Sequence, residues 1–148
     1  MCYDISFTTK IELIIDYLPG IITDPQISFN FENGIHVLAQ AHEGYPVVVF
    51  EDGHYKLKLF EWGVIADYMN TPEKIRKSRQ WMCNAQSEKI VRDKNAYWNR
   101  IRSQRCLIPV NGTYEHRDIK GWKNKVDFIK INDKSISRID LSNNHFGV

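Results

Sequence analysis

The sequence predicts a single α+β domain in which strands dominate and two or three helices are interspersed. Its 148 residues are most simply one domain, long enough to bury a core. Short apolar runs bounded by turn signals recur along the chain, whereas helical spacing of apolar residues is confined to a few stretches. The composition, 43% hydrophobic and 26% charged, is that of an ordinary globular protein rather than a disordered chain.

The first half of the chain predicts one helix and three strands. Residues 11–18 place apolar side chains at helical spacing, and Pro19-Gly20 ends that pattern. A turn signal at 51–53 separates the last two of the strands, which we expect at 36–40, 45–50 and 54–65. Alternation in the last strand predicts that Tyr55, Leu57 and Leu59 face inward.

The second half predicts two helices and three strands. A helix over 71–80 has Thr71 as N-cap and Pro72 at its first position. A second helix over 93–104 begins at Asp93 as N-cap and buries Tyr97, Trp98 and Ile101. Residues 105–110 form a buried strand that ends in the turn Asn111-Gly112. Two short strands complete the domain, at 113–116 and 127–131.

Charge, hydropathy and cysteine content exclude several classes of protein. The net charge of +2 is too small to imply nucleic acid binding, so an anionic partner must meet a local basic patch. No apolar stretch is long enough for a membrane span, and the start lacks the pattern of a signal peptide. Three cysteines form no disulfide framework, so we expect reduced thiols and a cytoplasmic location. The five histidines show no paired spacing, so we expect neither a metal nor a cofactor.

The chain opens with MCYDISF, which places Cys2 directly after the initiator methionine. Removal of Met1 would leave an amine and a thiol on one residue, with reference pKa values near 7.7–8.0 and 8.5. With an aldehyde the amine forms an imine, and the thiol can close on it to give a thiazolidine ring. Cys2 could also act as an N-terminal nucleophile for acyl transfer. From its position alone, an incidental small residue at position 2 is the simpler interpretation.

Two polar stretches could carry chemistry. The stretch WMCNAQSE (81–88) holds Asn84, Gln86 and Ser87, whose groups could fix a substrate or simply bond their own loop. The stretch RCLIPVNGTYEH (105–116) projects Glu115 from a rigid strand after a turn. A carboxylate held there could act as general acid or base, although a surface glutamate is the commoner outcome.

Basic residues also alternate with aromatic ones. The three groups are Lys74, Arg76, Lys77 and Arg79 before Trp81; Arg100, Arg102 and Arg105 after Tyr97 and Trp98; and Lys120, Lys123 and Lys125 around Trp122. Cations beside stacking rings are typical of sites for single-stranded nucleic acid. Solvated helix faces next to core aromatics would give the same pattern.

Taken together, these motifs resemble the SOS-response-associated peptidase (SRAP) family of abasic-site processing proteins. The likeness consists of the Met-Cys start, EWGVIADYM (61–69), NAQSE (84–88) and RCLIPVNGTYEH (105–116), in the family's order. It covers about residues 1–130 of one domain spanning 1–148 and leaves an atypical tail at 131–148. The resemblance implies a compact α+β domain on a twisted, barrel-like set of strands with a positive cleft.

The resemblance also implies a function. Family members bind single-stranded DNA and bond covalently to its abasic sites through the N-terminal cysteine, after the domain removes its own Met1. Here Cys2 would form the crosslink, Asn84 would position it or the sugar, and Glu115 would shuttle protons. The DNA contacts implied are Trp62, Gln86, Ser87 and Arg105.

Several positions depart from the family pattern. Tyr3-Asp4 stands where many members have Gly-Arg, Gln86 replaces an arginine, and His116 replaces a tryptophan. The family's histidine motif, like H-x-R-M-P, is not found, and we expect a truncated or frame-shifted product that forms the crosslink better than it reverses it. Three alternatives stay open: a non-catalytic DNA-binding relative, an N-terminal-cysteine peptidase, and an inactive fragment. Nothing in the sequence sets an oligomeric state.

Overall fold

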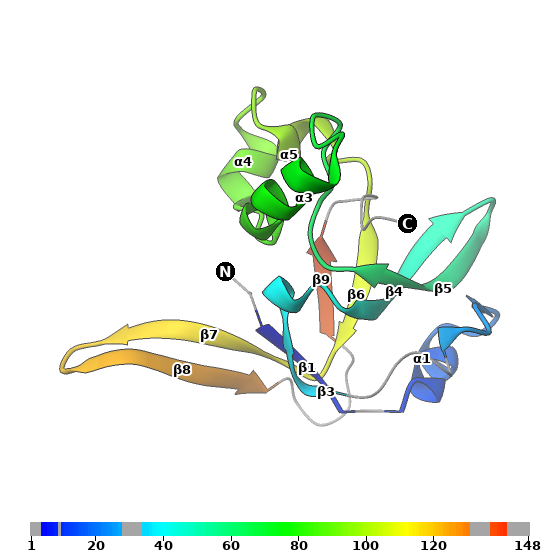
Figure 1. The fold of residues 1–148 in the computed structure, drawn as a ribbon. Coiled ribbons are helices and arrows are strands. Elements are labelled where there is room, and N and C mark those ends of the chain that lie inside the picture. Colours follow the sequence, from blue (N-terminus) through cyan, green and yellow to red (C-terminus); the bar gives the residue numbers. More distant parts are fainter. Residues whose placement is uncertain (1–3, 9, 28–33, 131–136, 142–148) are drawn as a thin grey trace.

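The strands form two sheets, which Figure 1 shows in a computed structural model that describes residues 4–8, 10–27, 34–130 and 137–141. The first sheet has the order β3-β1-β7-β8, all neighbours being antiparallel. Its strands are β1 (Asp4–Phe7), β3 (Gly34–Leu38), β7 (Gly112–Ile119) and β8 (Trp122–Lys130). The second sheet has the order β2-β5-β4-β6-β9, with only β2 and β5 parallel. Its strands are β2 (Ile22–Thr23), β4 (Gly44–Glu51), β5 (His54–Glu61), β6 (Cys106–Val110) and β9 (Ser137–Leu141).

Most of the helices gather at one end of the molecule. There, α3 (Pro72–Ser78), the 3-10 helix η2 (Arg79–Met82), α4 (Ser87–Val91) and α5 (Tyr97–Arg100) pack together. We call residues 72–105 the helical unit. The remaining helices are α1 (Glu12–Tyr17) and the 3-10 turn η1 (Ala39–Ala41). Figure 1 shows α1 far from the helical unit, at the other end of the second sheet.

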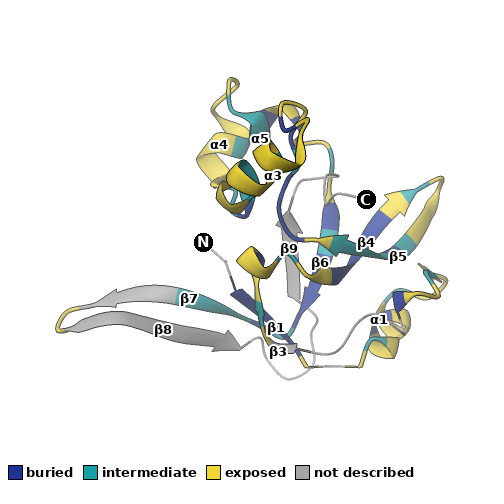
Figure 2. Cartoon of the chain, in the orientation of Figure 1, coloured by how far each residue is buried: buried dark blue, intermediate teal, exposed yellow. Residues whose placement is uncertain are grey.

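The main core lies where the two sheets meet, and the helical unit has a smaller core of its own. Ile5 and Phe7 of the first sheet are fully buried against side chains of the second, such as Val47, Leu57 and Ile108. The buried strand centres stand out in Figure 2. The smaller core consists of Trp98 and Ile101 of the helical unit together with Val64 from the segment before it. Burial of these apolar side chains is the main favourable term that holds each part together.

The structure confirms the α+β class and corrects its details. The described strands make two open sheets rather than a closed barrel. The helix expected over 93–104 is wrong in extent, because α5 runs only from Tyr97 to Arg100 with Ala96 as N-cap. Asp93 instead accepts a hydrogen bond from the backbone N–H of Asn95 (3.0 Å), the local bond of an Asx turn.

Two other expectations are corrected as well. At the expected turn Asn111-Gly112 the chain crosses from one sheet to the other, because β6 and β7 belong to different sheets. There the backbone N–H of Asn111 donates to the carbonyl of Ser6 (2.8 Å). Leu57 is buried as expected, whereas Tyr55 is 47% exposed, with its ring 5.1 Å from that of Phe50.

Candidate functional site

The first residue that the structure describes, Asp4, lies on a strand that pairs with the strand carrying Glu115. Asp4, the first residue of β1, pairs with Tyr114 of β7 on one side and Leu38 of β3 on the other. Glu115 follows Tyr114 on β7, and both residues are half-buried. Cys2, the expected nucleophile, lies outside the described residues.

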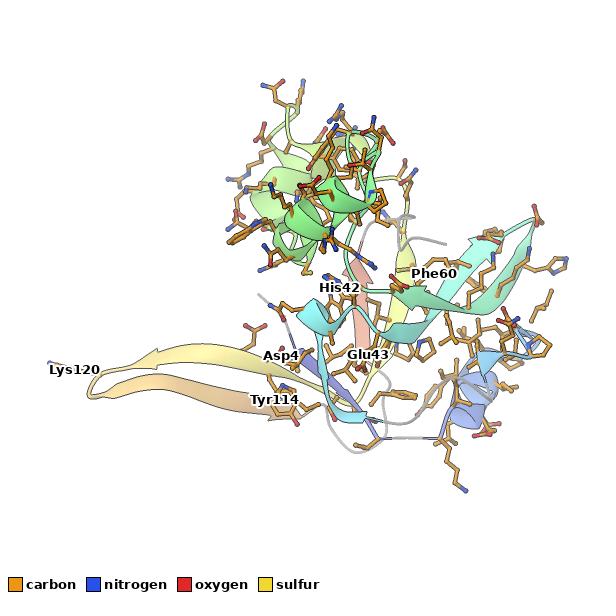
Figure 3. All side chains as sticks on the ribbon, in the orientation of Figure 1. Asp4, His42, Glu43, Phe60, Tyr114 and Lys120 are labelled. Atoms are coloured by element: carbon orange, nitrogen blue, oxygen red, sulfur yellow. The ribbon has the colours of Figure 1, made fainter. Side chains whose placement is uncertain are left out.

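A polar cluster flanks this junction. The imidazole Nε2 of His36 is 3.3 Å from the carboxylate Oδ2 of Asp4, and its ring centroid is 4.5 Å from that of Tyr114. Asp4 is buried, with only 8% of its surface exposed, and Figure 3 shows its side chain next to Tyr114. Asp4, which stands where many members of the family have arginine, thus has His36 as its partner. Through His36 of β3 and Tyr114 of β7, the polar cluster joins the two strands on either side of β1.

Asn84 lies on a segment that is fixed to the core at three points. The indole Nε1 of Trp62 donates to the carbonyl of Cys83 (3.0 Å), and the thiol of Cys83 donates to the carbonyl of Ala39 (3.7 Å). The backbone N–H of Val64 donates to the carbonyl of Met82 (3.3 Å). These bonds hold the backbone immediately before Asn84, whose own side chain is half-buried. The amide is therefore presented from a rigid position.

Trp62, one of the expected DNA contacts, is buried. Only 4% of its surface is exposed, and its polar edge is used by the bond to Cys83. Its ring is covered by protein in this structure, so a role of Trp62 in DNA binding stays a prediction. Trp62 contributes to the site by fixing the segment that carries Asn84.

The other expected DNA contacts lie on the surface of the helical unit. Gln86 precedes α4 and Ser87 is its first residue, and both are exposed. Arg105 is exposed just before β6, where its Nε donates to the carbonyl of Arg102 (3.1 Å). The structure thus places these three side chains in the same unit as Asn84, whereas Glu115 comes from the first sheet.

The helical unit carries half of the Lys and Arg residues of the chain and few acidic ones. Residues 72–105 contain ten Lys or Arg against three Asp or Glu, a net charge of +7, and the rest of the chain contains ten against fifteen, a net charge of −5. All of these ten cations except Arg79 are exposed. Figure 3 shows nitrogen-tipped side chains projecting outward around the unit. The small charge of the whole chain conceals this patch, which a count by segments would have found.

Arg79 forms the joint between the helical unit and the second sheet. Its Nη1 is 2.6 Å from Oε2 of Glu61 at the end of β5, and its side chain is only 11% exposed. Gly63, with φ of +105°, lets the chain turn beneath it, since a Cβ there would lie 3.2 Å from Cγ of Arg79. Sequence reasoning grouped Arg79 with the surface cations and missed this structural role.

The two cysteines that the structure describes are shielded from solvent. Cys106 is 2% exposed and Cys83 is 6% exposed. Burial raises the pKa of the Cys83 thiol, an effect that the nearby Arg79 only partly offsets. A protonated, covered thiol is a poor nucleophile. Among the described residues no group of His, Cys, Asp and Glu could hold a metal ion, and none of the helices found there has the length and hydropathy to cross a membrane.

Comparisons with known proteins agree with this architecture. The chain superimposes on a crystal structure of a protein from Bacteroides thetaiotaomicron with a TM-score of 0.75 and 24% identity, covering 94% of this chain and 58% of that one. A crystal structure of a protein from Bordetella bronchiseptica gives a TM-score of 0.56 and 17% identity, covering 78% and 51%. The chain thus spans little more than half the length of either protein. No curated protein matches it.

A family assignment comes from the sequence itself. The sequence model described as "SOS response associated peptidase (SRAP)" matches residues 1–139. The match therefore extends into the segment 131–148 that seemed atypical from the motifs, and it includes the first residues of β9 (Ser137–Leu141). The chain belongs to the SOS response associated peptidase family, which associates it with the response to DNA damage.

Proposed function

We propose that this protein binds single-stranded DNA and bonds covalently to its abasic sites through Cys2 after Met1 is removed. The observation that supports the proposal is the pairing of β1 with β7, in which Asp4 lies opposite Tyr114, the residue before Glu115. An N-terminal aminothiol next to a strand-borne carboxylate can trap an aldehyde, and the ring-opened form of an abasic sugar is an aldehyde. The covalent product would shield the lesion.

The chemistry needs two steps and no cofactor. The α-amine of Cys2 attacks the aldehyde carbon and, as water leaves, forms an imine. The thiol sulfur then adds to the imine carbon, its proton passes to the nitrogen, and a thiazolidine ring results. Glu115 would take and return the protons of water loss and ring closure, which is the work of a general acid and base. Asn84 would hold the N-terminal residue or the sugar by hydrogen bonds.

The same site would first have to release Met1. Hydrolysis of the Met1–Cys2 peptide bond exposes the amine on which imine formation depends, and this step would account for the peptidase in the family's description. Burial of Cys83 and Cys106 supports the assignment of the reaction to Cys2, because the other two thiols are covered. The positive helical unit would bind the phosphates that flank the lesion.

Incubation with single-stranded DNA that contains one abasic site tests the proposal. We expect a protein–DNA band that survives denaturing electrophoresis, disappears in Cys2→Ala and forms at least about tenfold more slowly in Glu115→Gln, since a positioned acid–base group contributes 10²–10⁴-fold. Intact mass should show the mature protein beginning at Cys2. An equally strong band from Cys2→Ala would contradict the mechanism. Salt-sensitive DNA binding without any band would instead identify a non-catalytic DNA-binding relative.

A further inference from the structure

Two nitrogen atoms of Arg79 are buried without a hydrogen-bond partner among the described residues: Nε and Nη2. The guanidinium is held at its third nitrogen, since Nη1 is 2.6 Å from Oε2 of Glu61, and the whole side chain is only 11% exposed. Buried donors of a charged group are costly to leave unpaired, so most of them in proteins have a partner. The two atoms therefore indicate a ligand that this part of the chain does not supply.

The unpaired atoms share one side of the planar guanidinium, which we call the free edge of Arg79. Their N–H groups point the same way and match two oxygen atoms of one oxyanion, the bidentate arrangement that arginine forms with phosphate. A water molecule there would leave the charge poorly balanced, because Glu61 contacts only Nη1 and its own side chain is 49% exposed to solvent. The free edge thus favours an anion with two adjacent oxygen atoms.

The imidazole of His42 lies against the same place. A Cβ at Gly63 would be 3.4 Å from Nε of Arg79 and 3.5 Å from Cε1 of His42, so the glycine lets both side chains approach its backbone. Nδ1 of His42 donates to the carbonyl of Trp62 (2.6 Å), and no described residue forms a hydrogen bond with its Nε2. His42 is only half-buried, and in the view of Figure 3 it lies between the helical unit and Asp4. This is the side from which a ligand would reach the free edge.

The helical unit favours phosphate as the oxyanion. Arg79 directly follows α3, whose exposed Lys and Arg side chains attract a polyanion. The carbonyl of Arg79 also accepts from the thiol of Cys83 (3.6 Å), the residue before Asn84. A phosphate on Arg79 would thus be held by the same anchored segment that presents Asn84.

We propose that the free edge of Arg79, with His42 beside it, is a binding site for one phosphate group. The group has two sources, a diester of a bound strand and free inorganic phosphate, which offer the same pair of oxygen atoms. The first source rests on the proposed DNA partner, whereas the second does not. With either one, the ligand stiffens the joint between the helical unit and the second sheet, because Nη1 keeps its contact with Glu61.

Thermal unfolding of the Cys2→Ala protein tests free phosphate without the covalent step. Inorganic phosphate that replaces chloride at constant ionic strength should raise the melting temperature, because a ligand that binds only the folded chain stabilises it. Added Arg79→Lys keeps the charge but lacks the fork, so we expect it to weaken the phosphate affinity at least about tenfold. The matched control is Arg92→Lys, the same change at an exposed position after α4, which should alter the affinity by less than about twofold.

Fluorescence anisotropy with an unmodified single-stranded oligonucleotide tests the strand as the source, with the same variants. A loss confined to the phosphate measurement identifies free phosphate as the ligand, and a loss confined to the oligonucleotide identifies the diester. Equal affinities of Arg79→Lys and Arg92→Lys for both ligands would overturn the proposal.

Nuclear magnetic resonance gives a readout that needs no variant at Arg79. In the ¹H–¹⁵N spectrum of arginine side chains, the buried Nε–H of Arg79 should be protected from exchange and should shift when its ligand is added. A protected signal that moves with neither phosphate nor the oligonucleotide would also refute the site. Because these measurements use neither Cys2 nor a lesion, a missing covalent band on abasic DNA would refute the crosslinking function alone.

Discussion

At the scale of the residue, Tyr45 shows how a buried polar group joins the strands behind the site. Its hydroxyl donates to the carbonyl of Pro109 at 2.5 Å, which ties β4 to β6. Its ring packs edge-on against Phe7 of the first sheet, with centroids 6.3 Å apart. Burial raises the pKa of Tyr45 well above its ordinary value, because the phenolate would be desolvated. The neutral, donating form is therefore part of the fold.

The raised pKa predicts that stability decreases at high pH. In the unfolded chain a tyrosine ionises near pH 10, whereas in the fold Tyr45 keeps its proton beyond that pH. Below about pH 10 both states are protonated and the contribution is complete; above it the unfolded state binds fewer protons and the free energy of unfolding falls. Urea denaturation between about pH 8 and 11 should show a shallower fall in Tyr45→Phe than in wild type. At neutral pH the variant should be about 1 kcal/mol less stable, because the Pro109 carbonyl loses its donor. Parallel curves would contradict the assignment.

At the scale of the element, local signals in the sequence were sufficient where the deciding interaction is local. Thr71 caps α3 as predicted, since its hydroxyl accepts from the backbone N–H of Lys74 at 3.3 Å. The helix expected at Asp93 failed because the same kind of side chain closes an Asx turn there, and one sequence cannot decide between the two bonds. The crossing at Asn111 was missed because pairing between distant strands, not turn chemistry, determines the sheet to which a strand belongs.

The same distinction applies to the site. The sequence predicted a short strand at 113–116, and Glu115 does lie on a strand, β7. The prediction succeeded because the signal for this strand is local. The sequence did not reveal the burial of Trp62, which depends on Cys83, twenty-one residues away, and on the core around both. Contacts of this range are set by tertiary packing and leave little trace in a local pattern.

The anchoring of the Asn84 segment gives a prediction with a matched control. Trp62→Phe removes the donor to the Cys83 carbonyl and should cost about 1–3 kcal/mol, because a buried acceptor loses its partner. Thr71→Ala removes the α3 cap and should cost about 1 kcal/mol. Only Trp62→Phe should also slow crosslinking to abasic DNA under conditions where both variants are folded, since only it releases Asn84. Equal crosslinking rates of the two variants would show that the anchor has no part in the reaction.

At the scale of the whole molecule, the uneven distribution of charge is the property that a whole-chain sum conceals. The helical unit carries +7 and the remainder −5, so the molecule presents a basic end and an acidic body. Such a distribution guides a polyanion toward one end and repels it from the other. Asn84 lies in the basic part. The field therefore favours binding of a strand where the chemistry is proposed to occur.

This arrangement predicts that the position of a charge matters more than the net charge. Arg76→Glu on α3 and Lys10→Glu before α1 change the net charge of the chain equally, and both side chains are exposed. Binding of single-stranded DNA, measured between about 50 and 200 mM salt, should weaken in Arg76→Glu, with a slope of log K against log salt smaller by about 0.7. Lys10→Glu should keep both the affinity and the slope of the wild type, because its residue lies outside the helical unit. If both variants weakened binding equally, net charge alone would govern the association, and the basic end would have no special role in it.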